Sequence, residues 1–279
     1  MLNSPTAFLA TAIALLVGSL TTEAVGQKST LVRDVELCNA PSSTGPDSRI
    51  AGCSALIKAH SDSPRVAAIA FHKRGLAYAE KGEYAQAIGD YDSAIKLNSS
   101  DPALFNDRGV AHEKKGELAR AIQDFSAAIS LDQSYATAVI NRADAYEKAG
   151  DHVRSLADLD TAIRLQPSSA LLNDRCWLRA LTGALDAALA DCNESIRLDP
   201  KMGGRFDSRG FVQLKLGHWE LAIADYTSAL ELQPTLASAL YGRGLAKLKL
   251  GDVSGNSDVA AATRLQPKLP AEFATYGIR

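Results

Sequence analysis

The sequence predicts an all-α solenoid of about six helical hairpins, preceded by one degenerate hairpin at the N-terminal end. The first observation behind this prediction is a pattern of Arg, Gly, Gly, Ala and Asp that recurs six times, with 33 or 34 residues between successive arginines. The second is that apolar residues recur at helical spacing on both sides of the second glycine of each copy. Self-similarity at this period is typical of stacked two-helix repeats, each of which buries its apolar face against its neighbours.

The first copy of the pattern is Arg74, Gly75, Gly82, Ala87 and Asp90, and most copies end on a leucine followed by a polar residue and a proline. This unit resembles the tetratricopeptide repeat (TPR), and the resemblance covers residues 68–269. It implies two antiparallel helices per unit and a right-handed superhelical array. The expected units are 68–101, 102–135, 136–168, 169–202, 203–236 and 237–269.

The conserved spacing of Arg and Asp within each unit predicts ion pairs. We number the residues of each unit from its first residue, so that Ala68 is position 1 of the first unit and the turn glycine is position 15. Two residues on the two antiparallel helices then lie side by side when their position numbers add up to about 30. The Arg at position 7 then meets the Asp at position 23, and the small residue at position 8 faces the Ala at position 20. We interpret the pairs as structural brackets rather than a ligand-binding stripe, because both partners recur together. The predicted pairs are Arg74–Asp90, Arg108–Asp124, Arg142–Asp158, Arg175–Asp191, Arg209–Asp225 and Arg243–Asp258.

The four cysteines fit two disulfide-bonded hairpins. Cys176 takes the place of the small residue at position 8, and Cys192 stands at position 24, where other units carry an aromatic residue. Residues 54–58 match residues 92–96, which places Cys53 at position 24 of a degenerate leading unit, with Cys38 15 residues earlier. Four cysteines allow three connectivities, and this frame favours Cys38–Cys53 and Cys176–Cys192. It disfavours a zinc site, which needs four ligands together.

The first 26 residues predict a signal peptide. An uncharged run at 8–20 is followed by Ala24, Val25 and Gly26, which fit a small-x-small cleavage site. Residues 27–67 then form an N-terminal cap with the Cys38–Cys53 hairpin. We expect an exported protein, periplasmic or else secreted, without stable membrane insertion after cleavage; an uncleaved anchor is the alternative. The whole layout resembles small exported TPR proteins of alphaproteobacteria.

The composition and the motifs of the chain argue against catalysis and against nucleic-acid binding. The net charge is −2, so there is no basic surface for nucleic acid. The five histidines show no metal-ligand spacing, and the glycines follow the repeat rather than a phosphate loop. We therefore expect no catalytic residue, no metal ligand and no cofactor, and we expect that the protein is not an enzyme.

The resemblance implies that the first helices of successive units line a concave groove. Its N-terminal half is polar, whereas its C-terminal half is apolar and is the candidate partner-binding surface. The alternative is that these apolar residues pack between units or under the C-terminal tail. The polar set is His72, Glu80, Asn106, Glu113, Lys114, Asp144, Glu147 and Lys148. The apolar set is Trp177, Leu181, Phe211, Leu214, Tyr241, Leu245 and Leu248.

These features predict a protein–protein interaction adaptor or scaffold that holds a peptide or protein in its groove. The alternative is a structural subunit of an envelope assembly, which docks through its C-terminal flank. The last unit predicts a weak second helix, because it carries Gly251, Gly255 and Asn256. The tail, residues 270–279, either folds back as a cap or leaves a flank that pairs with another protomer into a homo-oligomer.

Overall fold

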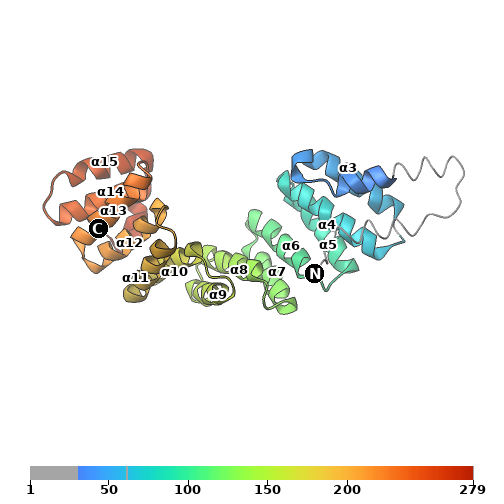
Figure 1. Cartoon of the computed structure of the whole chain (residues 1–279), viewed down its shortest axis with the longest axis horizontal. Helices are drawn as coiled ribbons and strands as arrows, with labels where there is room; N and C mark the ends of the chain where they lie inside the picture. The colour runs from blue at the N-terminus through green and yellow to red at the C-terminus, as the bar shows by residue number, and fades with distance from the viewer. Residues whose placement is uncertain (1–30, 61, 279) are drawn as a thin grey trace, which may run out of the picture. The chain divides into compact units, whose positions relative to one another are not determined.

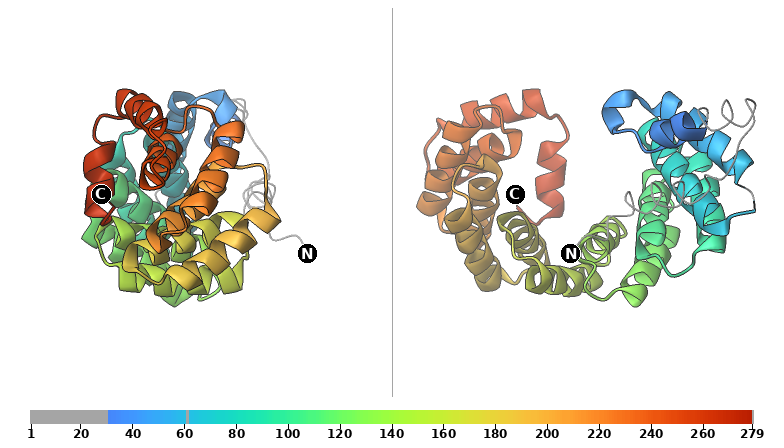
Figure 2. Two further views of the ribbon diagram at one scale, coloured as in Figure 1. Left: turned by 90° about the vertical axis from the view of Figure 1, so that its left-hand side faces the viewer. Right: turned by 45° about the vertical axis from the view of Figure 1, so that its right-hand side comes forward.

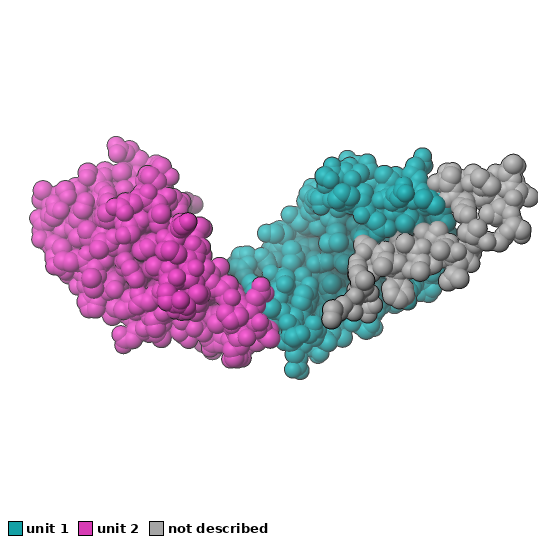
Figure 3. Space-filling view, in the orientation of Figure 1, with its two compact units in different colours: residues 1–149 teal, residues 150–279 magenta. Residues whose placement is uncertain are grey.

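The computed structural model describes residues 31–60 and 62–278, and the regular elements of this part are all helical, as predicted. The expected signal peptide and its cleavage site lie outside the described residues. The chain divides into two compact units, residues 1–149 and 150–279 (Figure 3). We call them unit 1 and unit 2 and describe each by itself.

Both units are series of antiparallel helical hairpins (Figure 1). In the described part of unit 1, the first helical segment covers residues 31–38. This unit continues with η1 (Ser42–Thr44), α3 (Pro46–Ala59), α4 (Pro64–Glu80), α5 (Tyr84–Leu97), α6 (Pro102–Lys114), α7 (Leu118–Leu131) and α8 (Ala136–Lys148). Unit 2 contains α9 (His152–Leu165), α10 (Ser169–Thr182), α11 (Leu185–Leu198), α12 (Gly203–Leu216), α13 (Trp219–Leu232), α14 (Ala237–Lys249), α15 (Gly255–Leu265) and α16 (Leu269–Thr275).

The first helices of the repeats begin close to the expected unit boundaries. The first residue of an expected unit is also the first residue of α6, α8, α10, α12 and α14. α4 begins earlier than expected, at Pro64, because proline suits the first helical position, where no backbone donor is needed. In α6 the side chain of Asp101 caps the helix by accepting a hydrogen bond from the backbone N–H of Ala103.

The second glycine of each copy ends the first helix. Gly82, Gly116, Gly183, Gly217 and Gly251 all have a positive φ, between 76° and 89°. An L-residue with a side chain is strained in this left-handed conformation, and a glycine is not. The repeat therefore needs glycine here for backbone geometry.

The first glycine, at position 8 of the unit, is explained in three copies by a contact that the sequence analysis did not predict. The predicted facing of position 8 and the small residue at position 20 is seen in the last unit, where Gly244 lies against Gly255, and stays a prediction in the others. A Cβ atom on Gly75 would lie 2.6 Å from the ring of Tyr91, and one on Gly109 would lie 2.7 Å from the ring of Phe125. The same close approach joins Gly210 to the ring of Tyr226. In these three copies position 8 is a glycine because the ring at position 24 occupies the space that a side chain would need.

This packing predicts opposite effects of two glycine-to-alanine substitutions in unit 1. Gly109→Ala should lower the free energy of unfolding by about 1–2 kcal/mol, because overpacking against the Phe125 ring outweighs the higher helix propensity of alanine. Gly89→Ala, in the exposed face of α5 with no atom within 4 Å of the added methyl group, should raise it by about 0.5–1 kcal/mol. Urea unfolding of the two variants checks both signs, and equal effects would contradict the assignment.

The N-terminal hairpin is held by a close backbone approach beside a disulfide. A Cβ atom on Gly52 of α3 would lie 2.6 Å from Cβ of Leu37 and 2.8 Å from the carbonyl oxygen of Asp34. Cys53 and Cys38 are buried at the same contact. α3 also packs along α4, so this hairpin covers the first repeat.

In the last hairpin the two helix backbones approach each other closely. A Cβ atom on Gly255 would lie 2.4 Å from the carbonyl oxygen of Gly244, so α14 and α15 cross without room for a side chain. α15 has 11 residues, against 14 in α13. Gly255 therefore shortens the second helix, as expected, and also serves a close contact that its poor helix propensity does not reveal.

Candidate functional site

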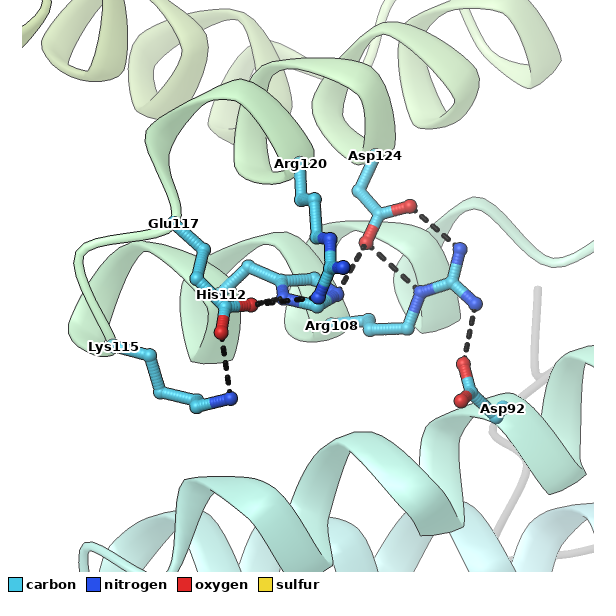
Figure 4. A network of polar contacts seen from close by, with 7 residues as sticks. All are labelled: Asp92, Arg108, His112, Lys115, Glu117, Arg120 and Asp124. Atoms are coloured by element: carbon cyan, nitrogen blue, oxygen red, sulfur yellow. Dashed lines mark hydrogen bonds and ion pairs between the residues drawn. The ribbon is translucent and has the colours of Figure 1, made fainter.

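Arg108 joins three helices of unit 1 (Figure 4). Its Nε donates to Oδ2 of Asp124 at 2.9 Å and its Nη2 donates to Oδ1 of the same carboxylate at 2.6 Å. Its Nη1 donates to Oδ1 of Asp92 at 2.6 Å, on the second helix of the preceding repeat. Asp124 is buried, and its hydrogen bonds raise the pKa of Arg108, so the guanidinium is held by a bidentate contact.

The same bidentate geometry occurs in other repeats. It joins Arg74 to Asp90, Arg175 to Asp191, Arg209 to Asp225 and Arg243 to Asp258. Burial opposes ionisation of Asp258, but hydrogen bonds from Arg243 and Lys247 lower the pKa of this carboxyl. Arg142 and Asp158 belong to different units, and their pair stays a prediction.

Sequence reasoning missed the second acceptor of these arginines. In five of the six repeats the Nη1 atom reaches back to a polar side chain of the preceding hairpin, at position 25 of that unit. The signal was present in the sequence, because position 25 is polar in each of these five preceding hairpins, but the hairpin frame considers only contacts within a unit. The acceptors are Ser54 for Arg74, Asp92 for Arg108, Ser126 for Arg142, Asp160 for Arg175 and Asn193 for Arg209.

A second polar cluster closes the turn between α6 and α7 (Figure 4). His112 Nδ1 and Lys115 Nζ each lie 2.7 Å from the carboxylate of Glu117. Hydrogen bonds from Lys115 and then His112 lower the pKa of Glu117 to about 2. His112 thus helps to hold the hairpin turn. Because the polar groups of this cluster contact one another, we assign the cluster a structural role.

The structure brings the cysteines together in the predicted pairs. Cys38 and Cys53 are disulfide-bonded with their Cα atoms 4.6 Å apart, and Cys176 and Cys192 with theirs 5.4 Å apart. Both bridges are buried. The second one joins α10 to α11 at the place where other hairpins set an aromatic ring against a glycine.

In unit 1 four of the polar side chains expected in the groove take part in bridges between successive first helices. His72 Nε2 lies 2.7 Å from Oδ2 of Asp107, linking α4 to α6. Asn141 donates to Asn106 at 2.9 Å, linking α8 to α6, and Lys148 donates to Glu113 at 2.7 Å. These residues hold neighbouring repeats together. A pocket between α4 and α6 is lined by Pro64, Arg65, Ala68, Ile69, His72, Leu97, Asn98, Asp101 and Leu104.

In unit 2 the apolar groove residues face α16. The rings of Trp177 on α10 and Phe211 on α12 lie 4.7 Å apart, and both contact Tyr276, at 5.6 and 5.7 Å between centroids. Phe273 of α16 lies 5.9 Å from Phe211 and 4.8 Å from Tyr241 on α14. One short segment thus contacts the first helices of three successive repeats. Figure 2 (right) shows this last helix, in red, on the inner side of the curved helix stack of unit 2.

This arrangement corresponds to the alternative in which the tail covers the apolar residues. Phe211, Leu214 and Tyr241 are buried. Trp177, Leu181 and Leu245 are partly buried against the same core, while Leu248 is exposed. The apolar set is therefore one surface, as expected, but α16 already covers much of it. The sequence carried no repeat position for residues after Pro267, so it could not place them.

A half-buried carboxyl lies on α12 beside this core. Ser238 Oγ donates to Oδ2 of Asp207 at 2.7 Å. Burial raises the pKa of Asp207 to about 6, although the hydrogen bond from Ser238 opposes this rise. The buried hydroxyl of Tyr226 is close enough for the Asp207 charge to raise the pKa of that phenol further.

The raised pKa predicts that stability falls as pH rises. An unfolded Asp ionises near pH 4, whereas folded Asp207 keeps its proton to about pH 6, so the folded state binds more protons between these values. The free energy of unfolding should decrease across pH 4–6 by up to about 3 kcal/mol from this group. Asp207→Asn should remove that part of the pH dependence and stabilise the protein at pH 7. Urea titrations at pH 4, 5, 6 and 7 check this, and an unchanged profile would contradict it.

Within residues 31–60 and 62–278, no group of three or more His, Cys, Asp or Glu side chains is arranged to hold a metal ion. In the same part of the chain, no helix has the length and hydropathy needed to cross a membrane. The features that remain are surfaces formed by helices.

Known proteins share this repeat and this fold. The family described as "TPR repeat" matches residues 75–116 and 210–251, and two families described as "Tetratricopeptide repeat" match residues 140–202 and 103–135. The chain belongs to the tetratricopeptide repeat proteins, as the resemblance predicted. Proteins with this fold are typically non-enzymatic scaffolds that bind proteins or peptides. No curated protein matches the chain in sequence.

Similar solved structures agree on the fold. A tetratricopeptide repeat protein from Parabacteroides merdae is 16% identical, with a TM-score of 0.66, over 90% of this chain and 98% of that one. PilF of Pseudomonas aeruginosa is 17% identical, with a TM-score of 0.61, and the match covers 76% of this chain and 98% of PilF. YrrB, described as a TPR protein with an unusual peptide-binding site, is 19% identical, with a TM-score of 0.54, over 63% and 92%.

Proposed function

We propose that this protein is a non-enzymatic adaptor that holds a peptide or a protein segment in the groove formed by α10, α12 and α14. The observation that carries the proposal is that this groove holds a helical segment, α16, through Trp177, Phe211 and Tyr241. A surface that takes one amphipathic helix has the shape and the apolar contacts to take another. Aromatic anchors of this kind are also the residues that dominate binding energy in protein interfaces.

The two disulfides point to an oxidising compartment, because thiols are kept reduced in the cytosol. Together with the predicted signal peptide, this supports an adaptor that works after export, in the periplasm or outside the cell. Its partner is then a protein or peptide of that compartment.

A capture experiment with matched variants tests the groove. Immobilised wild-type protein should retain a set of proteins from an envelope extract, and the variant Trp177→Ala/Leu181→Ala should lose them. The control Val153→Ala/Leu221→Ala removes two exposed apolar side chains elsewhere on unit 2 and should retain them. Thermal melting of all three proteins ensures that the fold is kept. Equal retention by the groove variant would refute the proposal.

The alternative, docking of the C-terminal flank into an envelope assembly, has less support. Leu265 of the last repeat is 54% exposed, and its counterparts Leu97, Leu131, Leu165, Leu198 and Leu232 are 40–45% exposed. The last hairpin therefore exposes little more apolar surface at this position than the hairpins inside the array.

A further inference from the structure

α16 contacts the groove through one face. Leu269 and Phe273 are almost fully buried, and Tyr276 packs against the same core. Leu269 and Phe273, four residues apart, lie on one side of the helix, and Tyr276, the C-cap residue that follows the last turn, continues the spacing to i+7. The contact is thus the kind that a free amphipathic helix makes with a groove, with three anchors in a row.

α16 differs from the repeat helices in how it is held. It has 7 residues, its N-cap residue Lys268 gives no side-chain cap, and it follows the break at Pro267. A helix of this length is marginal by itself, so its order depends on the groove. The sequence from 267 onward also lies beyond the last Arg–Asp bracket, which joins Arg243 to Asp258. Gln266 donates to Glu272 at 2.9 Å and fixes the start of the segment.

The groove is complete without α16. The pair Trp177–Phe211 and the ring of Tyr241 belong to α10, α12 and α14, which are held by the Cys176–Cys192 bridge and by the pairs Arg209–Asp225 and Arg243–Asp258. Those restraints do not involve α16. Removal of α16 should therefore leave the aromatic residues in place and available.

We propose that α16 is a replaceable ligand of this groove, whose exchange partner is a short helix of another protein that presents a leucine, an aromatic residue four positions later and a second aromatic residue three positions after that. This proposal rests on the proposed function, because it uses the same groove. It goes further by stating which residues the partner helix presents to that groove. Because α16 is tethered at a high effective concentration, it competes with the partner and lowers the apparent affinity.

Fluorescence anisotropy with a labelled peptide of residues 267–279 tests this exchange. The receptors are the full chain, the full chain with Phe273→Ala/Tyr276→Ala, and a chain that ends at Gln266. In the double alanine variant and in the shortened chain, α16 no longer occupies the groove, and we call these two proteins the released receptors. We expect them to bind the peptide at least tenfold more tightly than the wild type does. A peptide with alanine in place of its phenylalanine and tyrosine should not bind any of the three.

Four results would overturn the proposal. The first is a folded released receptor that does not bind the peptide, and the second is equal binding by all three receptors. The third is loss of the folded state in both released receptors, which would make α16 a part of the core. The fourth is a wild-type dimer that the peptide disperses, which would assign the groove to α16 of a second copy. If the peptide fails but Trp177→Ala/Leu181→Ala still abolishes partner capture, the adaptor function stands and only the helical partner is refuted.

Discussion

Asp124→Ala should lower the free energy of unfolding of unit 1 by about 3–5 kcal/mol, because it leaves the Arg108 guanidinium partly buried without its bidentate partner. Asp124 is 6% exposed, so water replaces little of what is lost. Urea unfolding followed by circular dichroism measures the change.

Asp92→Ala is the matched control, since it removes the other carboxylate of the same arginine. The Asp92 side chain is 45% exposed, and exposed ion pairs contribute about 0–1 kcal/mol. If the two alanine variants were equally unstable, the distinction between a buried bracket within a hairpin and a half-exposed link between hairpins would be wrong.

Loss of the Cys176–Cys192 bridge should cost about 3 kcal/mol, since the bond closes a loop of 16 residues in the unfolded chain. We expect Cys176→Ala/Cys192→Ala to unfold at correspondingly lower urea concentration than the oxidised wild type.

The repeat suggests a specific rescue. Gly210 and Tyr226 occupy the equivalent positions in the next repeat, where a ring packs on a glycine. Cys176→Gly/Cys192→Tyr should therefore recover part of the loss, and its stability should be independent of the bridge when dithiothreitol is added. A Gly/Tyr variant no more stable than the Ala/Ala variant would show that the bond and the ring are not equivalent solutions.

Features that repeat could be predicted from the sequence. The Arg–Asp spacing predicted contacts such as Arg175–Asp191, and the frame placed Cys176 opposite Cys192. Both follow from the antiparallel geometry of one hairpin, which the 34-residue period defines. The contact of Gly109 with the ring of Phe125 was missed, because the rule of level positions ignores the reach of a ring.

The positions of residues outside the repeat pattern could not be predicted from the sequence. The position of Phe273 and Tyr276 depends on the shape that α10, α12 and α14 form together, and no periodic pattern describes residues after Pro267. The pKa of Asp207 likewise depends on burial beside Tyr226 and Ser238, from other helices. Such tertiary contacts between helices determine which groove residues are exposed to solvent.

Hydrogen–deuterium exchange of the full chain tests most directly the claim that unit 2 is a helix-binding groove with a replaceable occupant. Amides of residues 269–278 should exchange far faster than those of α12, and excess unlabelled peptide of residues 267–279 should accelerate them further while α12 stays protected. Exchange of residues 269–278 at the same rate as α12, unaffected by the peptide, would show that α16 opens only when unit 2 unfolds and would contradict the account.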